Sequence, residues 1–417
     1  MQRRVFVRNS ALALVTMGLS PTFLRRTALG MDLPRAAKGK VLICLFQRGA
    51  ADALNVVVPH GEPAYYALRP LIAIAPPNRA AGSAGAIDLD GFFGLHPALA
   101  PLKPLWDRGL LAPIHAVGSP SATRSHFDAQ DYMESATPDD KGTSDGWLNR
   151  YLATSRTCEQ CAASPFRAVA MTPQTPRVLQ GSAPTVAMNS VAEFSVRSGG
   201  TQAAELEALY RTGSADVIHG TGTEMFDAVK MLRSANPQRY QPENGAAYPK
   251  SQFGQRLLSI AQLIKSGVGL EVAFADVGGW DTHVNQGGAT GQLAQRLADF
   301  GEAIAALTTD LGDRMEDVVI ITMSEFGRMA KQNGNGGTDH GHAGAMFVIG
   351  GPVRGRQVVG RWPGLAPEQL YEGRDLALTT DFRAVFAEVA SKHLGASRLD
   401  ALFPGFTPGA SPGVLGS

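Results

Sequence analysis

The stretch from Val318 to Gly351 holds the densest group of side chains that could do chemistry. An apolar run from Val318 to Met323 has the length of a buried strand, and polar residues follow it directly. Among these, Glu325, His340 and His342 carry the oxygen and nitrogen donors that divalent metals prefer. A polar loop with a helix cap and solvated histidines would show the same pattern. Two of the nine histidines nevertheless lie within three positions here, which indicates a metal site.

Two further loops follow strand-like runs and add metal donors. Asp52 comes soon after the run from Val41 to Phe46, where it is placed either to hold a metal or to cap a helix. Asp281 and His283 come after the run from Leu270 to Ala275, and both can face one ion. Because open α/β sheets place their sites beyond the carboxyl ends of their strands, we expect these donors to meet.

A serine at the start of a helical pattern is the candidate nucleophile. Ser125 follows a strand-like run from Leu111 to Val117 and precedes apolar residues at helical spacing. Its hydroxyl would lie near the unpaired N–H groups and the positive end of the helix dipole. That position suits a helix cap, since serine is among the commonest caps, and it also suits attack on an anionic ester.

These groups together predict metal-assisted hydrolysis of an ester. Two metals roughly 4 Å apart would clamp the attacking and leaving oxygens, and one would deprotonate the serine hydroxyl. We expect Ser125 and Arg328 to act in catalysis, and Arg48 and Asn55, which lie near the end of the first strand, to bind the substrate. The histidines favour zinc or manganese, with calcium or magnesium as alternatives.

Strand-like runs alternate with helical patterns along the chain, which predicts a mostly parallel, doubly wound α/β sheet. The main domain should span residues 38–405. The periodic pattern weakens between about 158 and 247, and we expect an inserted lobe there. A Pro/Gly/Ser-rich end, 406–417, is expected to be a flexible tail.

The first residues have the features of an export signal. Arg3 and Arg4 precede Phe6 and an apolar run from Ala11 to Leu19, which is too short for a permanent membrane span. The pattern resembles a twin-arginine signal over residues 1–30, so we expect the twin-arginine export machinery to deliver the protein to the periplasm or beyond. A basic amphipathic first helix is the alternative. No other stretch is long enough to span a membrane.

Charge and cysteine content narrow the function classes further. The net charge of +1, with no basic stripe, gives no reason to expect nucleic-acid binding. Cys44 lies in a strand-like run and should be a buried apolar residue. Cys158 and Cys161 form a C-x-x-C pair that is typical of metal or redox sites in the cytosol. In an exported protein, a local disulfide is the plainer interpretation.

Five segments in order resemble the DUF1501 family: FQRGAADALNVVVP, TRSHFDAQDYMES, GGWDTHVNQ, SEFGR and GTDHGHAGAMFVIGG. These are exported bacterial proteins, often with twin-arginine signals, grouped with the alkaline phosphatase and sulfatase superfamily. The resemblance implies an alkaline phosphatase-like sheet with metals at its carboxyl edge. The family has no established activity.

The superfamily pattern also implies roles for individual residues. Asp52 would be the metal aspartate after the first strand, and Ser125 the nucleophile. Asp281 and His283 would hold one metal, Glu325 the other, and His340 or His342 would be the late metal histidine. The sequence departs from the pattern in having Asp-x-His in place of Asp-x-x-x-His, Ser-Glu in place of Asp-His, and no C/S-x-P-x-R motif.

Two functions remain open at this point. The first is an exported metal-dependent hydrolase of phosphate or sulfate esters, favoured by the hydroxyl and the donors in four loops. The second is a non-catalytic exported protein that keeps the fold and binds an anionic glycan or a protein partner, favoured by the altered spacings. The oligomeric state is not predicted.

Overall fold

The computed structural model describes residues 39–77, 84–155, 164–191 and 240–416. The expected signal peptide and the Cys158–Cys161 pair lie outside these residues, so neither prediction is tested. Within the described ranges, no helix has both the length and the apolar character needed to cross a membrane.

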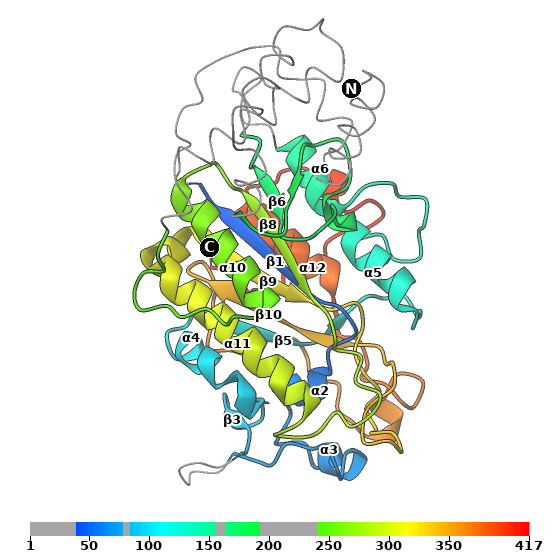
Figure 1. Cartoon of the computed structure of the whole chain (residues 1–417). Coiled ribbons are helices and arrows are strands. Elements are labelled where there is room, and N and C mark those ends of the chain that lie inside the picture. The colour runs from blue at the N-terminus through cyan, green and yellow to red at the C-terminus, as the bar shows by residue number, and fades with distance from the viewer. Residues whose placement is uncertain (1–38, 78–83, 156–163, 192–239, 417) are drawn as a thin grey trace, which may run out of the picture.

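An eight-stranded sheet runs through the centre of the molecule (Figure 1). Its order is β11-β5-β10-β9-β1-β8-β6-β7, and neighbouring strands are parallel except where β10 pairs with β5 and β9. The mostly parallel sheet that the sequence predicts is therefore confirmed. The strands are β1 (Val41–Gln47), β5 (Leu111–Gly118), β6 (Ala168–Ala170), β7 (Val186–Ala187), β8 (Val272–Val277), β9 (Val318–Met323), β10 (Gly344–Gly350) and β11 (Thr380–Asp381).

The three central strands end level with one another. In the pairing of β1 with its two neighbours, Phe46 lies opposite Asp276 of β8 and opposite Met323 of β9. Every residue of β1 is buried, as expected for a parallel strand covered on both faces. The loops that leave these strands therefore start from the same edge of the sheet.

Helices cover both faces of the sheet (Figure 1). Alternate residues of β1 enter two apolar clusters, with Ile43 and Leu45 in one and Leu42 and Phe46 in the other. The first cluster contains α4 (Lys103–Asp107), α10 (Gln252–Ser266) and α11 (Gln292–Leu311), and the second contains α5 (His126–Ser135), α6 (Trp147–Thr154) and α12 (Phe382–Glu388). This is the doubly wound arrangement. Cys44 is free and buried in the second cluster, as predicted.

Local sequence signals set the ends of the helices. The side chain of Ser251 accepts a hydrogen bond from the Gly254 N–H at the start of α10, and Gly267, with φ of 66°, ends this helix. The remaining elements are short. They are α2 (Ala53–Val56), α3 (Pro63–Leu68) and α13 (Leu399–Leu402), a small sheet of β2 (Val57–Val58), β4 (Gly94–Leu95) and β3 (Ile87–Asp88), 3₁₀ turns at Pro97–Leu102, Arg177–Leu179, Gly312–Asp317 and Pro367–Gln369, and a π turn at Val389–His393.

Two boundaries differ from the predicted organisation. Strands β6 and β7 lie within the expected lobe but form one side of the main sheet, so this part of the range belongs to the central fold. The expected flexible tail is docked. The buried carboxylate of Glu388 accepts hydrogen bonds from the N–H groups of Gly413, Val414 and Leu415, and the last two residues are buried. A carboxylate that satisfies several main-chain donors anchors this segment despite its Pro/Gly-rich sequence.

Candidate metal centre

The candidate site lies at the edge where the central strands end. The loop after β8 carries Asp281 and His283, and the loop after β9 carries Glu325. His340 precedes β10, and because β10 is antiparallel to β9, its beginning lies at this same edge. His126 is the first residue of α5, which follows β5. The fold thus gathers side chains that are far apart in the sequence.

His126, Asp281 and His340 form a group whose ligand atoms all lie within 4.8 Å of one another. The Nε2 atoms of the two histidines are 3.0 Å apart. His126 Nε2 lies 3.4 Å from Asp281 Oδ2, and His340 Nε2 lies 3.3 Å from Asp281 Oδ1. Ligands that surround a tetrahedral zinc at about 2.0–2.1 Å are about 3.3–3.4 Å apart. The histidines approach different oxygens of Asp281, and the three side chains are close enough together to offer ligands to one small ion.

The other ring nitrogen of each histidine at this site faces an acceptor. His126 Nδ1 lies 2.8 Å from Glu325 Oε1, and His340 Nδ1 lies 2.9 Å from the carbonyl oxygen of Arg124. His283 Nδ1 lies 3.1 Å from Asp339 Oδ1. These acceptors place the proton on Nδ1 and leave the Nε2 lone pair free, which is how second-sphere groups prepare metal-binding histidines.

The free Nε2 atoms point at one another. His283 Nε2 lies 3.0 Å from His340 Nε2 and 2.9 Å from Asp281 Oδ1. Lone pairs at such distances repel unless a proton or a cation lies between them. His283 thus adjoins the three-residue group and is a candidate further ligand.

Charges around the group favour a divalent cation. Three carboxylates lie around the group, those of Asp281, Glu325 and Asp339, and one guanidinium, that of Arg328, donates from Nη1 to Asp281 Oδ1 at 2.6 Å. With neutral histidines, this leaves two negative charges in excess. A divalent ion would balance them.

Hydrogen bonds and burial shift the pKa values of these groups. Burial would raise the pKa of Asp281, but the hydrogen bond from Arg328 and its charge hold it below the ordinary value. The Glu325 carboxylate raises the pKa of His126, which makes its nitrogen more basic. Burial lowers the pKa of His340, so this ring is neutral at neutral pH. The lowered pKa values of Asp281 and His340 favour the deprotonated forms that bind a metal, whereas the raised pKa of His126 favours its proton, which a metal ion would have to displace.

The group is open to solvent on one side. The side chains of His126 and His340 are 23% and 24% exposed, and that of Asp281 is 41% exposed. Glu325 behind them is fully buried. An ion with protein ligands on one side and water on the other has the open position that distinguishes catalytic from structural zinc sites.

Glu325 does not belong to the three-residue group, contrary to its predicted role as a ligand. Its Oε1 lies 2.8 Å from each of three groups that can donate, His126 Nδ1, the Gly49 N–H and Gln130 Nε2. Burial would raise its pKa, but the hydrogen bonds from His126 and Gln130 hold it below the ordinary value. Glu325 therefore acts on the site through His126.

Asp52 and Asn55 lie in a buried network away from the group. Asp52 Oδ2 accepts from Arg69 Nη1 and Gln286 Nε2, both at 2.6 Å, and its side chain makes no cap bond at α2. Asn55 Oδ1 accepts from Arg69 and from the Tyr65 hydroxyl. Buried charges require such partners, so these side chains stabilise the loop after β1 and do not line the open site.

His342 and Arg48 are also engaged elsewhere. The ring of His342 is buried and stacks on Tyr371 with centroids 4.2 Å apart. Arg48 donates to Glu134 Oε1 at 2.9 Å and to Asp276 Oδ2 at 2.7 Å, so its charge is already compensated. His342 was predicted to bind metal and Arg48 to bind the substrate. The structure shows ring stacking for the first side chain and ion pairing for the second.

Ser125 is the N-cap of α5, and its Oγ accepts from the Asp128 N–H at 3.5 Å. The residue next to it, His126, belongs to the three-residue group and was not predicted from the sequence. A signal was available, because the first residue of a helix that follows a strand lies at the same edge as the other candidates. Arg328 is placed at the site, where it holds Asp281 and does not reach the open side, since it is buried.

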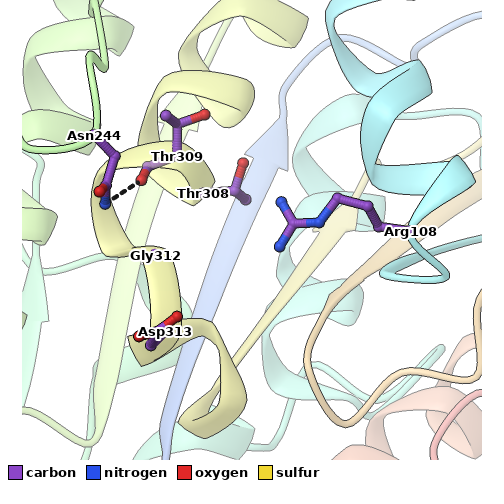
Figure 2. A pocket seen from close by; sticks show the side chains of 6 residues that line it. All are labelled: Arg108, Asn244, Thr308, Thr309, Gly312 and Asp313. Atoms are coloured by element: carbon purple, nitrogen blue, oxygen red, sulfur yellow. Dashed lines mark hydrogen bonds between the residues drawn. The ribbon is translucent and has the colours of Figure 1, made fainter.

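A surface pocket lies elsewhere in the molecule (Figure 2). Arg108, Asn244, Thr308, Thr309, Gly312 and Asp313 line it. It adjoins the end of α11, near where β9 begins, and therefore lies at the other edge of the sheet from the metal group. It contains no cluster of titratable or metal-binding side chains.

One family model agrees with the sequence resemblance. No curated protein matches the chain. The crystal structure of the PsFucS1 sulfatase from Pseudoalteromonas sp. aligns with 13% identity and a TM-score of 0.31, over 77% of this chain and 64% of the sulfatase. The chain thus spans less than two thirds of that protein. A family model described as a protein of unknown function, DUF1501, matches residues 114–401, which is more than half of the sequence, and the chain belongs to this family.

Proposed function

We propose that this protein is a metal-dependent hydrolase whose metal ion is held by His126, Asp281 and His340. The observation that carries the proposal is the convergence of the Nε2 atoms of these histidines beside the Asp281 carboxylate, while acceptors hold each Nδ1. The rings of His126 and His340 are partly exposed, and each Nδ1 already has a partner. At this site the inner nitrogens have only one another and a carboxylate.

A divalent ion held by these residues would supply Lewis acidity and would lower the pKa of a bound water molecule. The protein side chains do the remaining work. Glu325 orients His126 from behind, and Arg328 fixes the Asp281 carboxylate. The partly exposed rings of His126 and His340 leave room for a substrate from the solvent side.

The substrate class that we propose is an ester of phosphoric or sulfuric acid. It is supported by the sequence motifs that resemble the alkaline phosphatase and sulfatase superfamily. We propose water as the nucleophile in place of Ser125, because the Ser125 hydroxyl accepts a hydrogen bond from the Asp128 N–H of its own helix. This replaces the expected serine mechanism in our proposal.

Metal content and ester hydrolysis test the proposal together. Protein purified without chelator is expected to contain about one equivalent of zinc or manganese, by elemental analysis, and to hydrolyse aryl phosphate or sulfate esters. Carboxylic esters serve as the comparison. Chelation should abolish turnover, and adding the metal back should restore it.

A matched pair of histidines provides the control. His340→Ala removes a donor of the group, whereas His342→Ala, two positions away, removes a ring that stacks on Tyr371. We expect only the first variant to lose metal. A folded wild-type protein that binds neither zinc nor manganese at micromolar concentrations would refute the proposal. A protein that binds metal but hydrolyses none of these esters would favour the binding-protein alternative.

A further inference from the structure

A buried carboxylate lies behind His340, between two arginines. Asp375 is fully buried, and its Oδ2 accepts from Arg124 Nη2 at 2.7 Å and Nε at 3.3 Å. Its Oδ1 accepts from Arg374 Nε at 3.0 Å. A buried charge is costly unless it is paired and hydrogen-bonded, and here both oxygens have partners.

Both arginines also bind His340. The carbonyl oxygen of Arg124 accepts from His340 Nδ1 at 2.9 Å, and Arg374 Nη2 donates to the carbonyl oxygen of His340 at 2.6 Å. The first contact places the proton on Nδ1 of the ring and sets the orientation of the ring. The second holds the backbone from which the ring projects. The Asp375 carboxylate accepts from both guanidinium groups, so it fixes these two contacts relative to each other.

The main chain gives Asp375 a fixed position from which to act. Its N–H donates to the Tyr371 carbonyl at 3.0 Å, and its own carbonyl accepts from the Tyr371 N–H at 2.8 Å. Isolated bridges join Asp375 to Met329 and the adjacent Arg328 to His340. The main chain at Asp375 is therefore tied to the segment that pairs with His340.

We propose that Asp375 is a positioning residue for the metal centre, which holds His340 in its metal-binding orientation through Arg124 and Arg374. This inference rests on the proposed metal site and extends it to a residue in a separate loop. Second-sphere partners of metal-binding histidines typically contribute about 10- to 100-fold in metal affinity. Asp375 acts one contact further out, so a weakening of about tenfold is expected when its charge is removed.

Asp375→Asn is the informative change, because it keeps the shape of the side chain. Zinc affinity is measured by competition with a chromophoric chelator, and the d–d absorption of the cobalt-loaded protein reports the ligand geometry. We expect zinc to bind about tenfold more weakly and the cobalt spectrum to change. The melting temperature of the metal-free protein shows whether the variant is folded. If Asp375 had a purely structural role, its replacement would lower this melting temperature first.

Glu372→Gln is the matched control. Glu372 Oε2 accepts from the same Arg124 Nη2, at 2.6 Å, but its side chain is 50% exposed and does not contact Arg374. Water can replace this contact, so affinity and spectrum should match the wild type. Equal weakening in both variants would indicate a general charge effect and overturn the positioning role.

The remaining outcomes separate the two proposals. If the wild type binds metal and Asp375→Asn binds it equally well, with an unchanged cobalt spectrum, only the positioning role is wrong. If the wild type binds no metal, the metal centre and the positioning role are both wrong. Should Asp375→Asn fail to fold, Arg374→Met decides, because it removes the donor to His340 while Asp375 stays paired with Arg124. Unchanged affinity in that variant overturns the inference.

Discussion

Replacing Glu325 by glutamine should weaken metal binding while the fold persists. Glu325 Oε1 faces three groups that can donate, so an alanine would leave buried groups without partners at about 1–3 kcal/mol each. Glutamine keeps an acceptor oxygen at the same place and removes only the charge. Since charge-assisted hydrogen bonds are roughly twice as strong as neutral ones, His126 loses part of what orients it and makes it basic.

The expected loss follows from the complete burial of Glu325. Second-sphere changes typically cost about 10- to 100-fold in metal affinity, or about 1.4–2.8 kcal/mol. Asp339 gives a matched comparison, because it contacts His283 Nδ1 in the same way but is 51% exposed. Exposed ion pairs contribute about 0–1 kcal/mol, so Asp339→Asn should weaken binding by about fivefold or less.

Isothermal titration of metal-free protein with zinc, supported by chelator competition, measures both affinities. Thermal unfolding of the metal-free variants checks that each is folded. The reasoning is refuted if Asp339→Asn weakens binding as much as Glu325→Gln, because burial would then not decide the contribution. It also fails if the folded Glu325→Gln protein binds zinc like the wild type.

Three other predictions concern residues outside the metal group. Ser125→Ala should cost about 0.5–1 kcal/mol of stability, as loss of a helix cap, and should retain metal and turnover; loss of turnover with full metal content would restore the serine mechanism. Burial lowers the pKa of His115 from 6.5 to about 4. Between these two pH values, His115 is protonated in the unfolded chain and neutral in the folded protein. The free energy of unfolding should therefore fall as pH falls through this window, by up to about 3 kcal/mol. Urea unfolding, measured with a chelator present, should show a flatter pH dependence for His115→Asn than for the wild type. We also propose twin-arginine export, so changing Arg3 and Arg4 to lysine should leave the precursor in the cytoplasm, and normal export of this variant would contradict the proposal.

Hydrophobic patterns predicted most of the fold because burial decides it. The run from Val318 to Met323 is a strand with the predicted ends, and the run from Leu111 to Val117 forms a strand that continues one residue further, to Gly118. Every residue of both strands is buried, and their sequences show the apolar runs that such burial requires. The docked C-terminal segment was missed, because its order comes from a distant carboxylate, Glu388, and not from its own sequence.

The site was harder to predict, because the type of a residue does not reveal in which direction its side chain points. His340 and His342 are equivalent in sequence, yet one faces the metal group and the other stacks on Tyr371. Asp52 follows a strand as a metal ligand would, but Arg69 and Gln286 bind it in the interior. His126 was overlooked beside Ser125, because a serine before a helix is a familiar signal and a histidine at its first position is not.

The metal group joins parts of the chain that are remote in sequence, with 214 positions separating His126 from His340 and 59 separating Asp281 from His340. Donors so far apart cannot chelate an ion in the unfolded chain without closing long loops. An ion held there would be a cross-link specific to the folded state, adding about 2.7 kcal/mol at a free concentration one hundred times its dissociation constant. Metal supply would then set the lifetime of the protein against proteolysis as well as its activity.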